Sequence, residues 1–330
     1  MRFAKFIFSV LIICLVVMAL LEYAYRNYST SAARLFKPYF EKAETVETIY
    51  IGNSHIGVFN GIFPQGVKEV GNLSLGGQDV FRMYTAIKTV IPKSPALKKI
   101  YLGLDYDLIG YNQTKSGQEY IDREYYEFTG ELYNNTLTNR LMSRSIFFRS
   151  NRDIAYLFKR NKGEKEELNF IPVANKPVEE EKKVVDQATN NRLVDTSATL
   201  KTETLLSHKT FNPFMCRKRA EEHSLLKFKQ KNIPENLEYL NRIVQLCKQH
   251  NIELVFFDPP KTECYKSGCS KTNVELAKHT IDSFATANKI PYVDFYNDTT
   301  FNNDMFVDYD HLNLVGVKIL SDKLSFNNRK

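Results

Sequence analysis

The 330-residue chain has no dense run of basic residues, although its formal net charge is +7. Its 45 lysines and arginines are scattered among 38 aspartates and glutamates. Because nucleic-acid binding needs basic side chains gathered on one face, this scatter argues against a nucleic-acid partner. The chain also lacks a CxxC or HxxxH pair, which are spacings typical of zinc ligands. We therefore expect no metal site and no other cofactor.

Cysteine is scarce, with five residues in the chain. Cys14 lies in an apolar run, and four cysteines follow it: Cys216, Cys247, Cys264 and Cys269. An even number beyond the apolar run is compatible with disulfides. The segment "CYKSGC" closes a small loop with a Ser-Gly turn, so Cys264 and Cys269 are the expected pair.

One long apolar run is present, "FIFSVLIICLVVMALL" at residues 6–21, and Arg2 and Lys5 precede it. At about 1.5 Å per residue these residues span roughly 24 Å, and Tyr23 and Tyr25 can extend the helix into the interface. We expect residues 1–25 to be an uncleaved anchor that contacts the membrane through residues 6–25. The cations would lie inside and the remaining chain on the extracytoplasmic side. A cleaved signal peptide is the alternative.

Beyond the anchor and a linker at residues 26–44, the chain is read as one domain, residues 45–330. Apolar, β-branched segments predict buried parallel strands at Thr48–Gly52, Val67–Asn72, Lys99–Leu104, Ile252–Asp258 and Ile290–Phe295. Apolar residues at helical spacing predict helices at Val80–Ile91, Pro234–His250, Thr272–Asn288 and Asn313–Phe326. This alternation predicts an α/β fold with a doubly wound, mostly parallel sheet.

Residues 111–231 interrupt the alternation and are read as an insertion. Its first part, from Tyr111 to Tyr133, is rich in aromatic residues, and residues 159–191 have little apolar periodicity. The latter stretch is expected to be a flexible loop. Long loops in compact domains are uncommon unless they form lids, binding surfaces or disordered linkers. The insertion is therefore a candidate for substrate or partner contact, with a solvated loop as the alternative.

Candidate catalytic residues occur at the two ends of the domain. Ser54 follows the first predicted strand directly, and "DYDHLN" near the C-terminus contains Asp308 and His311. A serine becomes nucleophilic when a histidine takes its proton and a carboxylate orients that histidine. Ser54 is therefore the candidate nucleophile, His311 the candidate base and Asp308 the candidate orienting residue.

Three segments in this order resemble the sequence blocks of the SGNH (GDSL-like) hydrolase superfamily: "IGNSHIG", "GNLSLGGQD" and "DYDHLN". The resemblance implies a flavodoxin-like, three-layer fold with about five parallel strands. It also implies the roles given above for Ser54, His311 and Asp308. Its oxyanion hole would use the backbone N–H of Ser54, the N–H of Gly76 or Gly77, and an asparagine side chain.

Asp105 stands where the family has that asparagine, and an ionised carboxylate would repel an oxyanion. Three explanations are open: Asp105 is protonated, another group such as Asn53 or Asn72 donates, or the activity is not simple ester hydrolysis. His55 is a competing base, and Asp310 is an alternative orienting residue. Asp258 and Asp294 also end predicted strands, where acids cap turns or line a site.

The membrane-anchored arrangement resembles extracytoplasmic proteins that O-acylate or D-alanylate cell-envelope polymers. It implies an acyl-enzyme on Ser54, an acyl donor, an envelope glycan acceptor and, as a further possibility, a membrane-protein partner. The aromatic stretch Tyr111–Tyr133 is a candidate sugar-stacking surface. A catalytically silent, membrane-tethered assembly protein and a free esterase are the alternative functions.

Overall fold

A computed structural model describes residues 2–26, 30–57, 69–117, 119–145 and 210–327. Within these residues, five parallel strands form one sheet in the order β2-β1-β3-β4-β5. Their bounds are β1 Thr48–Ile51, β2 Val70–Asn72, β3 Lys99–Gly103, β4 Glu253–Asp258 and β5 Tyr292–Asp294. This is the order of a flavodoxin-like sheet, in which sites form outside the carboxyl ends of the strands. The predicted fold class is confirmed.

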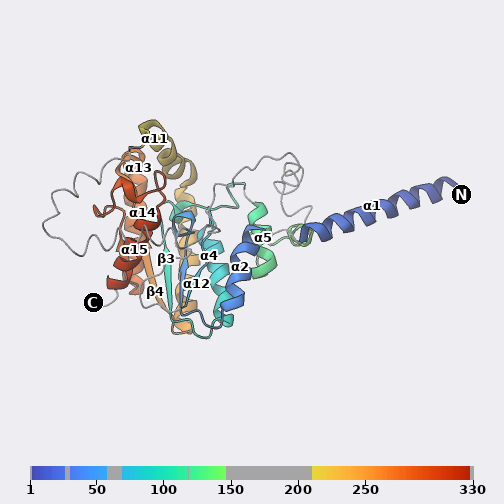
Figure 1. The fold of residues 1–330 in the computed structure, drawn as a ribbon, viewed down its shortest axis with the longest axis horizontal. Helices are drawn as coiled ribbons and strands as arrows, with labels where there is room; N and C mark the ends of the chain where they lie inside the picture. The colour runs from blue at the N-terminus through green and yellow to red at the C-terminus, as the bar shows by residue number, and fades with distance from the viewer. Residues whose placement is uncertain (1, 27–29, 58–68, 118, 146–209, 328–330) are drawn as a thin grey trace.

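Both faces of the sheet are covered, because successive side chains of a strand point to opposite faces. Ile49 and Ile51 of β1 belong to a core shared with α2, α4, α12 and α14, whereas Tyr50 belongs to a second core with α15. Figure 1 shows the sheet between α15 on one side and α2, α4 and α12 on the other. The fold therefore has the three layers that the resemblance implies.

The helices surround this sheet in the order of the chain. The α-helices are α1 Arg2–Arg26, α2 Ser31–Lys42, α3 Ser54–Gly57, α4 Val80–Val90, α5 Glu119–Thr129, α6 Leu137–Arg144, α11 Pro213–Glu221, α12 Ile233–Gln249, α13 Glu263–Gly268, α14 Lys271–Asn288 and α15 Leu314–Asn327. Short 3₁₀ helices are η1 Ile91–Lys93, η2 Leu108–Gly110, η4 Gln230–Asn232 and η5 Asn303–Met305, and η3 Glu222–Lys227 is a π-helix. The four longer helices predicted from the sequence correspond to α4, α12, α14 and α15.

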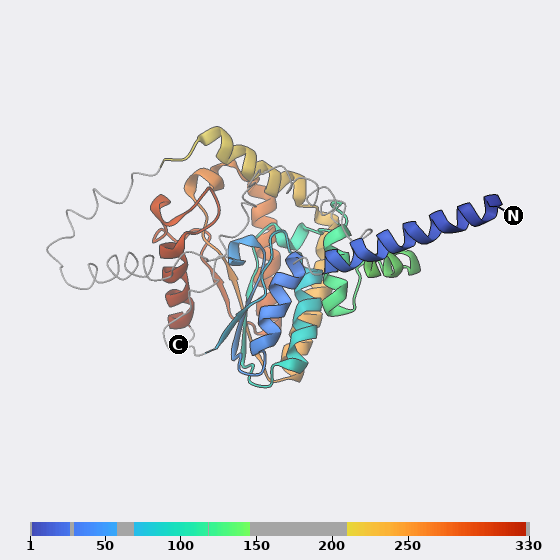
Figure 2. The same cartoon turned by 45° about the vertical axis from the view of Figure 1, so that its right-hand side comes forward.

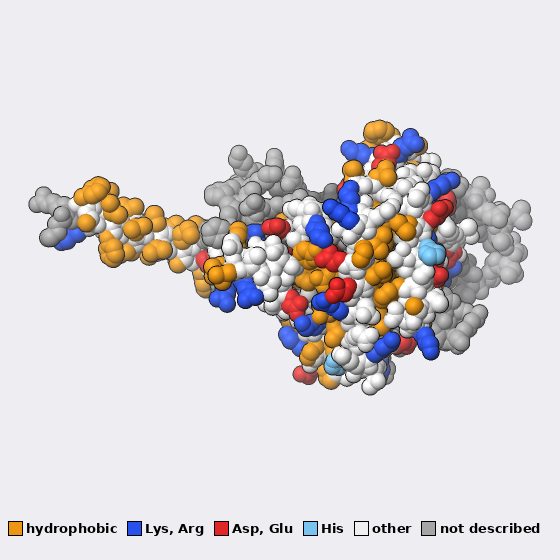
Figure 3. Space-filling model, turned by 180° about the vertical axis from the view of Figure 1, so that it is seen from behind, with side chains coloured by type: hydrophobic (Ala, Val, Ile, Leu, Met, Phe, Trp, Pro, Cys, Tyr) orange, Lys and Arg blue, Asp and Glu red, His pale blue; other side chains and the backbone are white. Residues whose placement is uncertain are grey.

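Helix α1 projects away from the domain (Figures 1 and 2). Its segment Phe3–Tyr23 has a mean hydropathy of 2.8 and is long and apolar enough to cross a membrane. Figure 3 shows apolar side chains along the exposed length of this helix. A helix that is apolar on all sides and does not pack against the domain is suited to a bilayer.

Residues 26–44 are more than the linker expected from the sequence. They contain α2, which begins after Thr30, whose hydroxyl accepts a hydrogen bond from the Ala33 N–H at 3.0 Å. Phe36 and Tyr39 of α2 are buried in the core. The helical spacing of these aromatic residues was the overlooked signal, because they form one apolar face.

The ends of the predicted insertion also belong to the folded domain. Tyr125 of α5 packs edge-on against Phe36 of α2, with ring centroids 5.5 Å apart. Ala220 of α11 and Phe228 lie in the same core. The stretch at residues 159–191, predicted to be a flexible loop, lies outside the described residues.

The disulfide joins Cys216 to Cys264, so the expected pairing of Cys264 with Cys269 is wrong. Helix α13 separates Cys264 from Cys269 by more than one turn, and a rise of about 1.5 Å per residue keeps them apart. Helix α11 instead lies against α13 and places the Cα of Cys216 5.8 Å from that of Cys264. Cys269 remains a thiol, with its sulfur 3.3 Å from the Tyr106 hydroxyl.

Candidate active site

Ser54 lies where β1 passes into α3. The Asn53 carbonyl accepts hydrogen bonds from the N–H groups of Ile56 and Gly57, each at 3.1 Å, which closes a tight turn beyond the strand. Gly52 permits this turn, because a Cβ atom there would lie 2.4 Å from Cγ1 of Ile56. The sequence thus places the Ser54 hydroxyl at the carboxyl end of a central strand.

A short hairpin before α15 presents the other two candidates. An antiparallel bridge between Phe306 and Leu312 closes the hairpin. At its tip, the Asp308 carboxylate accepts hydrogen bonds from the N–H groups of Asp310 at 3.1 Å and His311 at 2.8 Å. The Asn313 side chain then accepts hydrogen bonds from the first turn of α15. This local bonding fixes Asp308 and His311 relative to each other.

The structure brings Ser54, His311 and Asp308 together in one line. Nε2 of His311 lies 2.9 Å from Oγ of Ser54, and Nδ1 lies 3.0 Å from both carboxylate oxygens of Asp308. Ser54 and His311 are 257 residues apart in the chain. The distances and order are those of a nucleophile, a base and an orienting carboxylate.

Asp310 lies beside this line without replacing Asp308. Its Oδ1 is 3.4 Å from Nδ1 of His311, compared with 3.0 Å for Asp308. Burial alone would lower the pKa of His311, but the two neighbouring carboxylates outweigh burial and raise it to about 9. Burial of Asp310 is likewise outweighed by its contacts with His311 and His55, which hold its pKa well below the usual range.

His55 does not contact the Ser54 hydroxyl but joins two buried carboxylates. Its Nδ1 lies 2.6 Å from Asp105 and its Nε2 lies 3.0 Å from Asp310. Lys261 completes the arrangement with an ion pair to Asp105 at 2.6 Å, and neither of those side chains is exposed. His55, the competing base, therefore belongs to a buried network of polar side chains formed by Lys261, Asp105, His55 and Asp310.

The predicted insertion, residues 111–231, also contributes side chains to this buried network. Arg219 of α11 donates a hydrogen bond from Nε to Asp310 at 3.2 Å, and Nδ1 of His223 in η3 lies 3.5 Å from the same carboxylate oxygen. Burial lowers the pKa of His223 well below its usual value, since it disfavours the charged ring. Two residues of the insertion, which was a candidate for substrate or partner contact, thus contact Asp310, and Asp310 in turn lies beside His311.

Asp105 is not an oxyanion donor in this arrangement. Burial favours its neutral form, but His55 and Lys261 outweigh burial and lower its pKa, so the carboxyl group is ionised. An ionised carboxylate carries no proton to donate. The contacts with His55 and Lys261 favour the ionised form of Asp105, so they argue against a protonated Asp105 among the three explanations offered by the sequence.

Other groups near the serine retain unused donors. Within the described residues, no hydrogen-bond acceptor contacts the backbone N–H groups of Ser54, Gly76 and Gly77. Gly77 has a φ of +69°, a backbone conformation that favours glycine. The Asn72 side chain already donates to the Ile56 carbonyl at 3.0 Å, whereas the Asn53 side-chain nitrogen has no acceptor in the described part of the chain.

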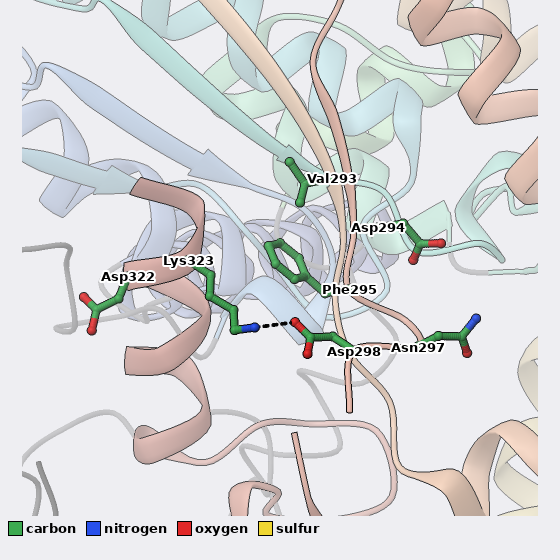
Figure 4. A pocket seen from close by; sticks show the side chains of 7 residues that line it. All are labelled: Val293, Asp294, Phe295, Asn297, Asp298, Asp322 and Lys323. Carbon is green, nitrogen blue, oxygen red and sulfur yellow. Dashed lines mark hydrogen bonds and ion pairs between the residues drawn. The ribbon is translucent and has the colours of Figure 1, made fainter. Parts of the chain in front are cut away.

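Two further strand-end acids belong to another cluster. Asp258 is buried, and Lys278 of α14 lies 3.5 Å from it and 2.6 Å from Asp294. Burial raises the pKa of Asp258 well above its usual value, with Lys278 opposing the shift. Asp294 and Lys323 line a surface pocket, where Lys323 pairs with Asp298 at 2.7 Å (Figure 4). No residue of the Ser54 site lines that pocket.

The aromatic stretch is mainly a packing element. Tyr111 and Tyr125 are buried in the core, so neither ring is available to stack on a sugar. The sequence offered this interpretation as an alternative to the stacking surface, because tyrosines pack equally well in cores.

One group of side chains has the composition of a metal site. Donor atoms of His55, Asp310 and His311 all lie within 4.8 Å of one another. In the structure these atoms contact each other, and the Nε2 of His311 faces the Ser54 hydroxyl. The geometry therefore favours proton transfer at Ser54 over ligation as the use of His311.

Comparisons with known proteins found similar solved structures, whereas the sequence comparisons found no match. No protein-family model and no curated protein sequence matches the chain. A GDSL-like lipase from Bacteroides thetaiotaomicron has 10% identity and a TM-score of 0.39, with 91% of this chain and 98% of that chain covered. A protein described as an acylhydrolase from Bacteroides fragilis has 10% identity and a TM-score of 0.38, over 92% and 99% of the two chains.

A third solved structure, described as a platelet activating factor from Streptococcus pneumoniae, has 12% identity and a TM-score of 0.44. The alignment covers 95% of this chain and 98% of that chain. At these identities the similarity carries no information about this chain's substrate.

Sequence reasoning missed three members of the site: Lys261, Arg219 and His223. Lys261 follows "DPP" at the end of β4, and strand-end position was a usable signal for it. Arg219 and His223 had no such signal, because their position depends on how α11 and η3 pack against the hairpin that contains Asp310.

The environment of His311 predicts an alkaline activity profile. Only neutral imidazole can accept the serine proton, and a pKa of about 9 leaves most of it charged at neutral pH. We expect kcat/KM to rise about tenfold per pH unit up to about pH 9 and then level off. Turnover of an activated ester measured from pH 6 to 10 would check this.

The Asp310→Asn variant should move the same rise to lower pH, because one of the carboxylates that stabilise the imidazolium is removed. Asp298→Asn, which changes the remote pair with Lys323, is the matched control and should leave the profile in place. A rise centred near the ordinary histidine pKa in the unmodified protein would contradict this assignment.

Proposed function

We propose that this protein is an extracytoplasmic serine acyl-enzyme protein that transfers an acyl group, acetyl or similar, to a hydroxyl of a cell-envelope polysaccharide or to water. The observation that carries the proposal is the line from Asp308 through His311 to the Ser54 hydroxyl, at 3.0 Å and 2.9 Å. The membrane-spanning character of α1 supports action at a membrane surface.

The proposed reaction has two half-reactions. Ser54 Oγ attacks the donor carbonyl carbon while Nε2 of His311 takes the hydroxyl proton, and the leaving group then departs with that proton. In the second half, an acceptor hydroxyl or water gives its proton to Nε2 of His311 and attacks the carbonyl carbon of the acyl-enzyme. The bond from that carbon to Ser54 Oγ then breaks, and His311 returns the proton to Oγ. Asp308 holds the histidine with Nδ1 protonated throughout, so Nε2 remains the atom that exchanges protons.

Stabilisation of the oxyanion is assigned to neutral donors. The backbone N–H groups of Ser54 and of Gly76 or Gly77 are two of these donors, and the Asn53 side chain is the proposed third. Each donor typically contributes about 100-fold to 1000-fold in rate. The ionised Asp105 acts behind the site, where it fixes His55 and Lys261.

A covalent probe tests the proposal directly. The full chain in detergent micelles is treated with a fluorophosphonate, which reacts with activated serine hydroxyls, and the modified peptide is identified by mass spectrometry. We expect one label per chain, on Ser54, and none in the Ser54→Ala variant. Ser74→Ala alters a nearby buried serine and should label like the unmodified protein.

One observation favours a second candidate, a silent membrane-tethered assembly protein: the ionised Asp105 stands where the family has a neutral donor. A folded chain that neither takes the fluorophosphonate label nor turns over any activated ester would favour this candidate. Product analysis with a soluble glycan acceptor separates transferase from esterase, because only a transferase yields acylated acceptor.

A further inference from the structure

Helix α6 presents leucines and arginines on one exposed face. Leu137 and Leu141 are 73% and 57% exposed, and Arg140 and Arg144 are exposed beside them. Positions three and four apart share a face of a helix, so all four side chains point outward together. Ser143, on the opposite face, is 1% exposed and marks the side that packs on the domain.

The same helix ends against the domain-proximal end of the apolar helix α1. The hydroxyl of Ser145, the residue after α6, donates a hydrogen bond to the Glu22 carboxylate at 3.2 Å. Glu22 lies within the last turn of the segment Phe3–Tyr23 that is able to cross a membrane. Figures 1 and 2 both show the green helix that follows α5 close to the point where α1 meets the domain.

Contact with Glu22 places the C-terminal end of α6 beside the end of the apolar segment of α1. If α1 spans the membrane, Glu22 lies at the boundary between acyl chains and headgroups, because a carboxylate is unfavourable inside the hydrocarbon. A side chain in contact with Glu22 then lies at the same level. The last turn of α6, with the exposed Leu141 and Arg144, is consequently within reach of lipid.

We propose that α6 lies on the bilayer surface as an interfacial helix. Leu137 and Leu141 insert between the lipid headgroups, and Arg140 and Arg144 bind the phosphates of anionic lipids. Interleaved leucine and arginine suit this interface, since the leucines gain apolar contact while the long arginine stems keep their charges at the headgroups. Together α1 and α6 make two contacts with the membrane and so set the orientation of the catalytic domain.

A single tryptophan can report this contact, because the chain contains none. The full chain carrying Leu141→Trp is reconstituted into vesicles of phosphatidylcholine and phosphatidylglycerol, with and without brominated acyl chains. We expect blue-shifted emission and roughly twofold quenching by the brominated lipid. Val307→Trp replaces another apolar side chain, 61% exposed before α15, and should stay unquenched by lipid and open to acrylamide.

The arginines are tested in the Leu141→Trp background. Arg140→Glu combined with Arg144→Glu should reduce the lipid quenching in anionic vesicles, because the new carboxylates are repelled by the headgroups. Arg217→Glu combined with Lys218→Glu changes an exposed cationic pair on α11 and should leave the quenching unchanged.

Vesicle flotation separates the contact from the anchor. If the Leu141→Trp protein floats with the vesicles while its tryptophan stays open to acrylamide and unquenched by lipid, α6 does not touch the bilayer. Blue-shifted emission without lipid quenching would show that a protein surface covers α6 and would equally overturn the proposal. Failure to float would remove its premise, the spanning α1, and would leave fluorophosphonate labelling of Ser54 unaffected.

Discussion

Ser54→Ala should lower turnover of an activated ester by about 10⁴-fold to 10⁶-fold, and His311→Ala should lower it as much. Both losses follow from one contact, the 2.9 Å approach of Nε2 of His311 to Oγ of Ser54. Because the two groups act as one unit, the double variant should be no slower than either single variant. Steady-state kinetics of the four proteins at the pH optimum measures this.

Additive losses in the double variant would contradict the shared role, because they would mean that the two residues act in separate steps. Full turnover by Ser54→Ala would identify another nucleophile. The fold of each variant is checked by circular dichroism, so that a loss of structure is not mistaken for a loss of catalysis.

The two carboxylates near His311 should respond differently to the same substitution. Asp308→Asn removes the acceptor 3.0 Å from Nδ1 and should cost about 10⁴-fold in kcat, because the imidazole is no longer held in the working tautomer. Asp310→Asn leaves that hydrogen bond in place and should mainly shift the pH profile. The reverse pattern would make Asp310 the orienting residue.

Lys261→Met should lower the free energy of unfolding by roughly 3–5 kcal/mol. Lys261 and Asp105 form an ion pair at 2.6 Å and neither side chain is exposed. Loss of the lysine leaves a buried carboxylate with only His55 as a partner, and burial of such a charge is costly. The free energy of unfolding is obtained from urea denaturation of the full chain in detergent.

A surface pair of the same chemistry provides the matched control. Lys98 pairs with Glu47 at 2.8 Å, but the lysine side chain is 71% exposed, and such pairs contribute about 0–1 kcal/mol. Lys98→Met should therefore have little effect. The double variant Lys261→Met with Asp105→Asn should recover most of the loss, because the isolated charge is removed with its partner. An undiminished loss in the double variant would assign the effect to packing instead.

The linear sequence was sufficient to predict the sheet and the three candidate site residues that the structure brings together. Strands such as Thr48–Ile51 are short, β-branched and buried on both faces, and these properties are local enough to be read from the chain. Ser54 and the Asp308–His311 pair were predicted from their places at a strand end and before a helix, together with the resemblance of three sequence blocks to the SGNH hydrolases. Parallel topology then places both junctions at the same edge of the sheet.

The disulfide and the linker show where local patterns fail. Cys264 and Cys269 were paired by their closeness in the chain, but the helix between them holds their sulfurs apart and α11 supplies Cys216 instead. Residues 26–44 were predicted to be a linker although Phe36 and Tyr39 have helical spacing, and the packing of α2 against α5 shows that this segment belongs to the core.

The sequence by itself determined the α/β class, the apolar N-terminal helix and the candidate nucleophile, base and orienting carboxylate, because each depends on residues that are adjacent in the chain. Tertiary structure alone decided the state of Asp105, since its charge depends on His55, 50 residues away in the chain, and on Lys261, which is farther still. It also decided the contact of Arg219 with Asp310 and of α6 with the end of α1. Side-chain electrostatics depends on distances between elements, and packing sets those distances.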